Sequence, residues 1–199
     1  EAYKFQSITP VKNLEDEYAG NVFSDIPNPM GKLHRNKDNK DKKSRLVGNL
    51  YAELHLFDGF MFKTSFGADY NNLYRRSFSP KYDEINASEK LSGLSNRNAW
   101  NFNWVFTNTL NYTKTFGDHT INALLGLESL RNRYEYFTAS RDGFPSDDPN
   151  FHFLDAGDVG TQKNSGSATE YSMVSYFGKI DYNYHDRYLV AFTLRRDGS

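Results

Sequence analysis

The chain has 199 residues, no cysteine and a nearly balanced charge, with 24 Lys and Arg against 25 Asp and Glu. The lack of cysteine excludes disulfides, thiolate zinc sites and thiol catalysis, and the balanced charge argues against a nucleic-acid-binding protein. Mean hydropathy is -0.76 and apolar runs are short, so no transmembrane helix is predicted. Aromatic residues make up 16% of the chain, which suits strands with one apolar and one polar face.

Residues 1–44 are predicted to be an irregular loop region, because three prolines interrupt any regular element. The end of this region is strongly basic, with seven Lys or Arg residues and His34 between Lys32 and Arg45. Aromatic residues do not alternate with these charges. This stretch is therefore interpreted as a solvated loop and not as a nucleic-acid-binding segment.

Residues 45–199 show a period of two in hydrophobicity, which predicts strands. Three hairpins are expected, at about 45–72, 99–138 and 169–196. Two-residue turns join the strands of each hairpin, at Asp58-Gly59, Gly117-Asp118 and His185-Asp186. The links between hairpins are long, roughly 73–98 and 142–168, and they all fall at the end of the sheet opposite to the short turns.

This plan is typical of an all-β, antiparallel, up-and-down transmembrane β-barrel segment. About six long strands would have short periplasmic turns and long extracellular loops. In hydrocarbon every backbone N–H and C=O must pair within the sheet, so the strands are continuous and their outward faces are apolar. Tyr and Trp collect at the membrane interfaces, where we expect the following residues: Trp100 near a long loop, and Tyr112, Tyr182, Tyr184 and Tyr188 near short turns. Soluble β-sandwiches and small barrels also have alternating strands and remain alternatives.

Five blocks of sequence resemble the SusC/RagA-type TonB-linked outer-membrane receptors of Bacteroidota. They are RLVGNLYAEL from Arg45, GFMFKTSFGADYN from Gly59, NTLNYTKTFGDHTINALLG from Asn108, GFPSDD from Gly143 and SYFGKIDYNYHDRYLVAFTLRRDGS from Ser175. Together they span about three quarters of the chain, from Arg45 to Ser199, in the order typical of the family. Residues 1–44 match poorly, so nothing is inferred for them from the family.

The resemblance implies a plugged outer-membrane barrel of about 22 strands, of which this chain is a fragment from the middle. It implies an importer in the cell outer membrane for oligosaccharides or peptides, in contact with outer-membrane lipid. It also implies a SusD-type lipoprotein partner and energy from the TonB complex through an N-terminal part that this sequence does not contain. Six strands alone leave two open edges, so the segment by itself is expected to aggregate instead of inserting stably.

The residues expected to touch cargo are uncharged hydrogen-bonding side chains on the inner face of the second hairpin: Asn101, Asn103, Thr107, Thr109 and Asn111. The alternative is that they only wet the barrel wall or contact the plug. Three aromatic residues of a long loop, Phe144, Phe151 and Phe153, are candidates for stacking on sugar rings or packing under the lipoprotein. Folding of that loop onto itself is the alternative.

No catalytic or metal-binding pattern and no cofactor are predicted. The five His residues are scattered, and His119 and His185 are expected in solvated turns. An acidic loop, with Asp142, Asp147, Asp148, Asp155 and Asp158, lacks the order of a calcium-binding loop and is interpreted as a polar loop. An enzyme is not predicted. The competing functions are a soluble or surface-anchored glycan-binding β-sandwich and a structural barrel or adhesin without a plug.

Overall fold

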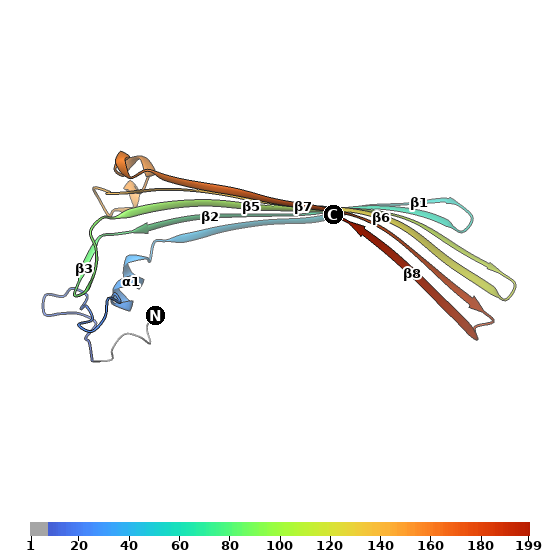
Figure 1. The fold of residues 1–199 in the computed structure, drawn as a ribbon, viewed down its shortest axis with the longest axis horizontal. Coiled ribbons are helices and arrows are strands. Elements are labelled where there is room, and N and C mark those ends of the chain that lie inside the picture. The colour runs from blue at the N-terminus through green and yellow to red at the C-terminus, as the bar shows by residue number, and fades with distance from the viewer. Residues whose placement is uncertain (1–7) are drawn as a thin grey trace. The chain divides into compact units, whose positions relative to one another are not determined.

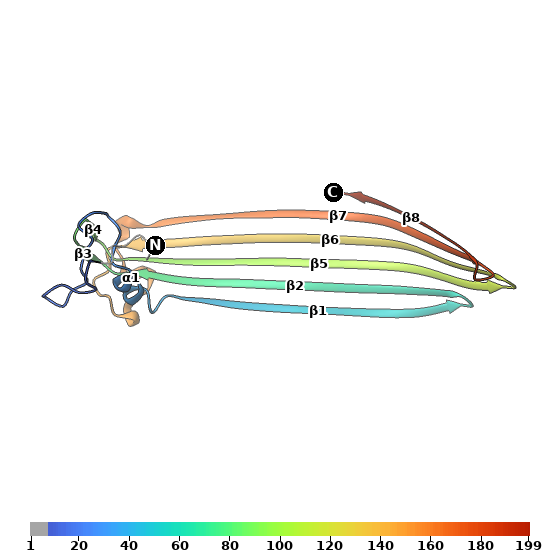
Figure 2. The same ribbon diagram turned by 90° about the horizontal axis from the view of Figure 1, so that it is seen from below.

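The computed structural model describes residues 8–199 and places six long strands in one antiparallel sheet (Figures 1 and 2). Their order in the sheet is β1-β2-β5-β6-β7-β8. The bounds are Lys40–Phe57 for β1, Phe60–Ser79 for β2, Gly93–Phe116 for β5, His119–Asp142 for β6, Lys163–Tyr184 for β7 and Tyr188–Gly198 for β8. A second, small sheet pairs β3 (Tyr82–Glu84) with β4 (Ala87–Glu89). The predicted all-β, up-and-down antiparallel fold class is confirmed.

The short turns have backbone conformations that explain their sequences. Gly59 has φ +79° and Gly117 has φ +58°, which lie in the left-handed region that glycine adopts most easily. The third turn has three residues instead of the predicted two, because β8 begins only at Tyr188. His185 and Asp186 both have φ +55° there, and the Asn183 side chain accepts a hydrogen bond of 3.1 Å from the Asp186 N–H.

The strands extend further than the alternating pattern predicts. β1 begins at Lys40, inside the segment expected to be irregular, and β2 continues to Ser79. The start of β5, at Gly93, also precedes its expected position. Apolar residues alternate only along the part of a strand where one face meets apolar surroundings. Hydrogen bonding between the strand backbones continues beyond that part, into water. The pattern therefore located the strands and underestimated their length.

The chain divides into two compact units, which are described separately. The loop unit holds the long links and comprises Glu1–Lys43, Leu73–Ala99 and Tyr136–Ser167, of which residues 1–7 are not described. The turn unit holds the three short turns and comprises Ser44–Asn72, Trp100–Glu135 and Ala168–Ser199.

The loop unit contains α1 (Pro29–Arg35), a short helix within the predicted irregular region. Asn28 caps it, since its side-chain oxygen accepts hydrogen bonds from the backbone N–H groups of Met30 and Gly31 at 3.0 and 3.3 Å. Within residues 8–199 no helix has the length and apolar character needed to cross a membrane.

The core of the loop unit is small and aromatic. Phe78, Leu94 and Phe144 are buried together, and Leu154 packs against them. The β6–β7 link, residues 143–162, reaches this core through three short 3-10 helices: Pro149–Phe151, Leu154–Ala156 and Val159–Thr161. A long link is thus folded onto the ends of the strands and is not an open loop.

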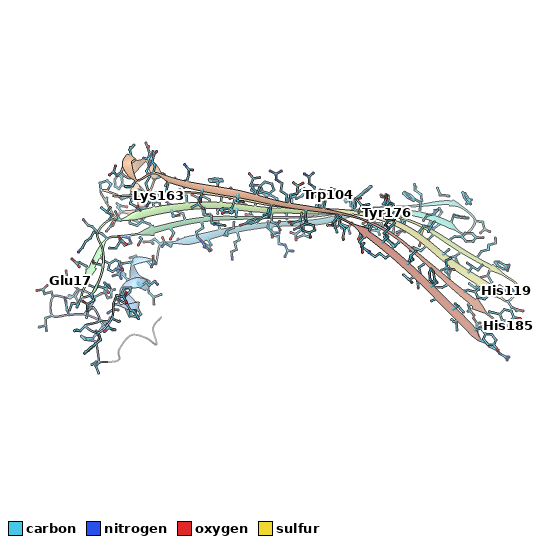
Figure 3. The ribbon with its side chains drawn as sticks, in the orientation of Figure 1. Glu17, Trp104, His119, Lys163, Tyr176 and His185 are labelled. Carbon is cyan, nitrogen blue, oxygen red and sulfur yellow. The ribbon has the colours of Figure 1, made fainter. Side chains whose placement is uncertain are left out.

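The turn unit consists of sheet alone and has two different faces. On one face aromatic rings contact each other across strands, with ring centroids 4.4 Å apart for Phe60 and Tyr112 and 6.3 Å apart for Phe66 and Trp104. Side chains project from both sides of the sheet, as Figure 3 shows. The strand alternation puts the predicted polar residues of β5 on the face opposite to Trp104.

Candidate functional site

The five polar residues predicted on the inner face of β5 lie in a hydrogen-bonded row. The Asn132 side chain of β6 donates to the side-chain oxygens of Asn101, at 2.8 Å, and of Asn103. Further along β5, the Asn111 side chain donates to the Thr109 hydroxyl at 3.4 Å. The amides and hydroxyls of this face thus bond to one another, and their contact with cargo stays a prediction.

Thr107 belongs to a separate network that crosses four strands. The Thr107 hydroxyl donates to Glu128 of β6 at 3.2 Å, and Arg195 of β8 donates to the other oxygen of Glu128 at 3.1 Å. Arg195 also donates to the Ser175 hydroxyl of β7 at 3.0 Å and to Asp197 at 2.8 Å. The single charge of Arg195 is therefore shared between two carboxylates on the polar face.

Strands β1 and β2 also carry ion pairs on their polar face. Arg45 makes a bidentate contact with Asp69, at 3.0 and 2.8 Å, and Lys63 contacts Glu53 at 2.8 Å. Bidentate Arg–carboxylate pairs fix geometry as well as charge. Arg45 and Lys63 are therefore each neutralised by a carboxylate of the neighbouring strand.

The partners of the predicted residues were not themselves predicted as site residues: Glu128, Asn132, Ser175, Arg195 and Asp197. The signal was available for Asn132 and Glu128, because a two-residue turn at Gly117-Asp118 fixes the register of β5 against β6. Arg195 could not be paired in the same way, since Glu128 and Arg195 belong to different hairpins.

The three loop aromatics have different environments. Phe144 is only 9% exposed and packs edge-on against Phe78, with ring centroids 5.6 Å apart. Phe151 and Phe153 are 56% and 64% exposed. In this conformation Phe144 holds the loop together, whereas Phe151 and Phe153 can be reached from solvent; their contact with cargo stays a prediction.

Next to this core lies His152, which the sequence gave no reason to single out. Its ring stacks on Phe78 with centroids 3.6 Å apart, and its Nε2 is 3.1 Å from the Asp147 carbonyl oxygen. Arg76 donates hydrogen bonds to the backbone oxygens of Pro149, at 3.4 Å, and of His152. Burial lowers the pKa of His152 below its ordinary value, because the charged imidazolium loses hydration.

The two histidines that were expected in solvated turns, His119 and His185, both contact side chains of another hairpin. His119, the first residue of β6, places Nδ1 2.7 Å from the Tyr182 hydroxyl. His185 lies in the third turn with Nε2 2.9 Å from the Asp118 carboxylate. Figure 3 labels both residues at the ends of their hairpins. These contacts connect the second hairpin to the third.

The acidic loop uses its carboxylates to organise the backbone. Asp148 and Asp158 cap two of the 3-10 helices by accepting backbone N–H groups at 2.9 and 2.8 Å. Asp142 and Asp155 form ion pairs with Lys163 and Arg141. Within residues 8–199 no three His, Asp or Glu side chains are grouped to hold a metal ion.

Known proteins are similar to this chain in sequence and in fold. TonB-dependent receptor P3 of Formosa agariphila is 31% identical over the whole chain, and SusC of Bacteroides thetaiotaomicron is 25% identical over 97% of it. The chain is similar to TonB-dependent receptors along its whole length. No family model matches it. The resemblance to SusC/RagA-type receptors is confirmed.

Solved structures agree in fold. The RagAB peptide importer in its closed-closed state matches 92% of the chain with a TM-score of 0.78 and 18% identity. The RagAB peptide transporter matches 86% of it with a TM-score of 0.73 and 22% identity. The chain spans about a fifth of these proteins and of the curated relatives, 20% for receptor P3. The predicted outer-membrane location is that of these receptors.

Proposed function

We propose that this chain forms part of the wall of a TonB-linked outer-membrane importer, with its polar face toward a water-filled interior. One observation carries the proposal: in the turn unit the ring contacts of Phe60 with Tyr112 and of Phe66 with Trp104 lie on one face, and the cross-strand hydrogen bonds of Asn101 and Thr107 lie on the other. Such a sheet suits lipid on one side and water on the other. The competing β-sandwich requires two packed sheets, whereas within residues 8–199 the second sheet has two strands of three residues each.

The remaining parts of the importer lie outside these residues in this proposal. A plug and its contact with the TonB complex would come from other segments of the parent protein, and a SusD-type lipoprotein would bind on the extracellular side. The similarity to SusC and to RagAB supports these partners. The relatives are receptors and transporters, and no enzymatic role is proposed.

The cargo is proposed to be an oligosaccharide or a peptide. The amides and hydroxyls on β5 suit solutes rich in hydroxyl or amide groups. Uptake of labelled oligosaccharides and peptides by cells with and without the parent receptor tests this. Loss of uptake on deleting the receptor, and on collapsing the proton gradient, is the expected result.

Cysteine labelling tests the orientation of the faces, because the chain has no cysteine of its own. Phe106 and Thr107 are neighbours on β5 and point to opposite faces. In outer membranes containing the parent receptor, Thr107→Cys should react with a water-soluble maleimide and Phe106→Cys with a lipid-soluble one. Thr109→Cys is a second polar-face position in case the plug shields Thr107. Equal aqueous labelling of both faces would contradict the proposal.

A further inference from the structure

Two lysines stand on the apolar face of β1, directly beyond its hydrophobic part. Side chains of a strand alternate between faces, so Lys40 and Lys42 share a face with Leu46 and Leu50. All four are exposed. The basic stretch interpreted as a solvated loop is thus partly a strand, in which Lys40 and Lys42 are in register with the apolar positions.

The same two lysines line a groove in the loop unit together with residues of β2. The groove has a volume of about 230 Å³, and Tyr74, Arg76, Pro149 and His152 also line it. Asp38 is the one acidic residue among those that line it. The groove therefore presents three cations against one carboxylate.

The cations of the groove differ from those on the opposite face of the same two strands. On the polar face Arg75 binds Asp41 in a bidentate pair, with both distances 2.7 Å, and Arg45 binds Asp69. Within residues 8–199 Lys40, Lys42 and Arg76 make no ion pair, and Arg76 contacts only backbone oxygens and the Phe153 ring. Positive charge in the groove is therefore left uncompensated by the protein.

We propose that this groove binds the phosphate-bearing headgroup of a lipid of the outer leaflet, and this inference rests on the proposed function. If Leu46 and Leu50 meet acyl chains, Lys40 and Lys42, which precede them on the same strand, reach the headgroup region, where Tyr74 also suits the interface. Lys and Arg near a membrane surface attract anionic lipid, and Arg side chains match phosphate geometry. Soluble cargo would pass along the polar face, where Arg45, Lys63 and Arg75 are already paired with carboxylates.

The test uses the full-length parent receptor purified in detergent. Binding of lipid A, and of the same lipid after removal of its phosphates, is measured by native mass spectrometry for the wild type, Lys40→Gln/Lys42→Gln and Lys43→Gln. Lys43 follows Lys42 in β1 and points to the opposite face, which makes it a matched control. Arg76 is left intact because it also holds the β6–β7 link.

We expect the double variant to lose affinity for the phosphorylated lipid about 25-fold, from about fivefold for each lysine. Lys43→Gln should bind the phosphorylated lipid as tightly as the wild type does. The dephosphorylated lipid should bind the wild type and the double variant with equal affinity. An equal effect of Lys43→Gln, or no effect of the double variant, would overturn the inference while leaving the importer proposal intact.

Two further outcomes distinguish a failure of the lipid site from a failure of the proposed function. Competition by inorganic phosphate as strong as that by the lipid would make the groove a site for free phosphate and overturn the lipid assignment. A parent receptor that is absent from the outer-membrane fraction, or whose two faces label equally, would instead overturn the proposed function, and the lipid site with it. Fractionation and labelling are therefore run on the same preparations.

Discussion

Replacing Glu84 should release the N-terminal part of the loop unit from the β3–β4 hairpin. The Glu84 side chain is only 3% exposed, and its two oxygens accept from Arg35 at 2.7 Å and from the Asn28 backbone N–H at 2.6 Å. Asn28 in turn caps α1 and donates to the backbone oxygens of Val11 and Ala19. One carboxylate thus holds a helix cap and an arginine together.

The size of the effect follows from burial. Removing one partner of a buried ion pair leaves the other charge uncompensated and costs about 3–5 kcal/mol. For Glu84→Ala the lower value corresponds to a rise of about 150-fold in the opening equilibrium of this segment. Asp83→Ala is a matched control, because the adjacent carboxylate pairs with Lys90 on an exposed surface, where such pairs contribute about 0–1 kcal/mol.

Limited proteolysis of outer membranes containing the parent receptor measures this opening. At low protease concentration the cleavage rate within residues 8–39 follows the population of the open state. Glu84→Ala should be cleaved much faster than the wild type and Asp83→Ala at nearly the wild-type rate. If the two variants are cleaved at equal rates, the buried pair does not hold the segment and the reasoning is wrong.

The remaining predictions concern the β6–β7 link and the first short turn. Since the folded pKa of His152 is depressed, the stability of the link should be complete above about pH 6.5 and decrease as the pH falls through the lowered pKa. Hydrogen-exchange protection of residues 143–162 at pH 7.5 and 5, corrected for intrinsic exchange, measures this, and His152→Asn should remove the difference. Gly59→Ala should destabilise the barrel more than Gly117→Ala: both have positive φ, but only at Gly59 would a Cβ collide with the Thr113 carbonyl oxygen. The temperature at which each variant of the parent receptor unfolds is measured by its heat-dependent gel migration. Equal unfolding temperatures for the two variants would contradict the expected collision.

The alternating pattern predicted the positions of the strands because alternation depends only on residues that are close in the sequence. The turns at Asp58-Gly59 and Gly117-Asp118 were predicted where the structure has them, since each contains a glycine at a position with positive φ. The third turn was one residue longer than predicted. No glycine marks it, and its length depends on the contact of Asn183 with Asp186.

The polar row on β5 was predicted as a set of residues but not as a network. Asn101 and Thr107 were chosen by alternation alone, and their partners lie 31 and 21 residues away in the sequence. The loop aromatics illustrate the same limit, because nothing in the sequence distinguishes Phe144, which is buried, from Phe151 and Phe153, which are exposed. Their difference arises from packing against Phe78, which lies near the end of β2.

The sequence by itself determined which residues face each side of a strand, because that depends only on the period of two along the chain. Only the tertiary structure decided what those residues meet. Lys40 and Lys42 appeared as members of a solvated basic loop until β1 was found to include them and the β6–β7 link closed a groove beside them. Contacts between segments distant in sequence leave no periodic trace, so the charge of that groove and the burial of His152 follow from folding alone.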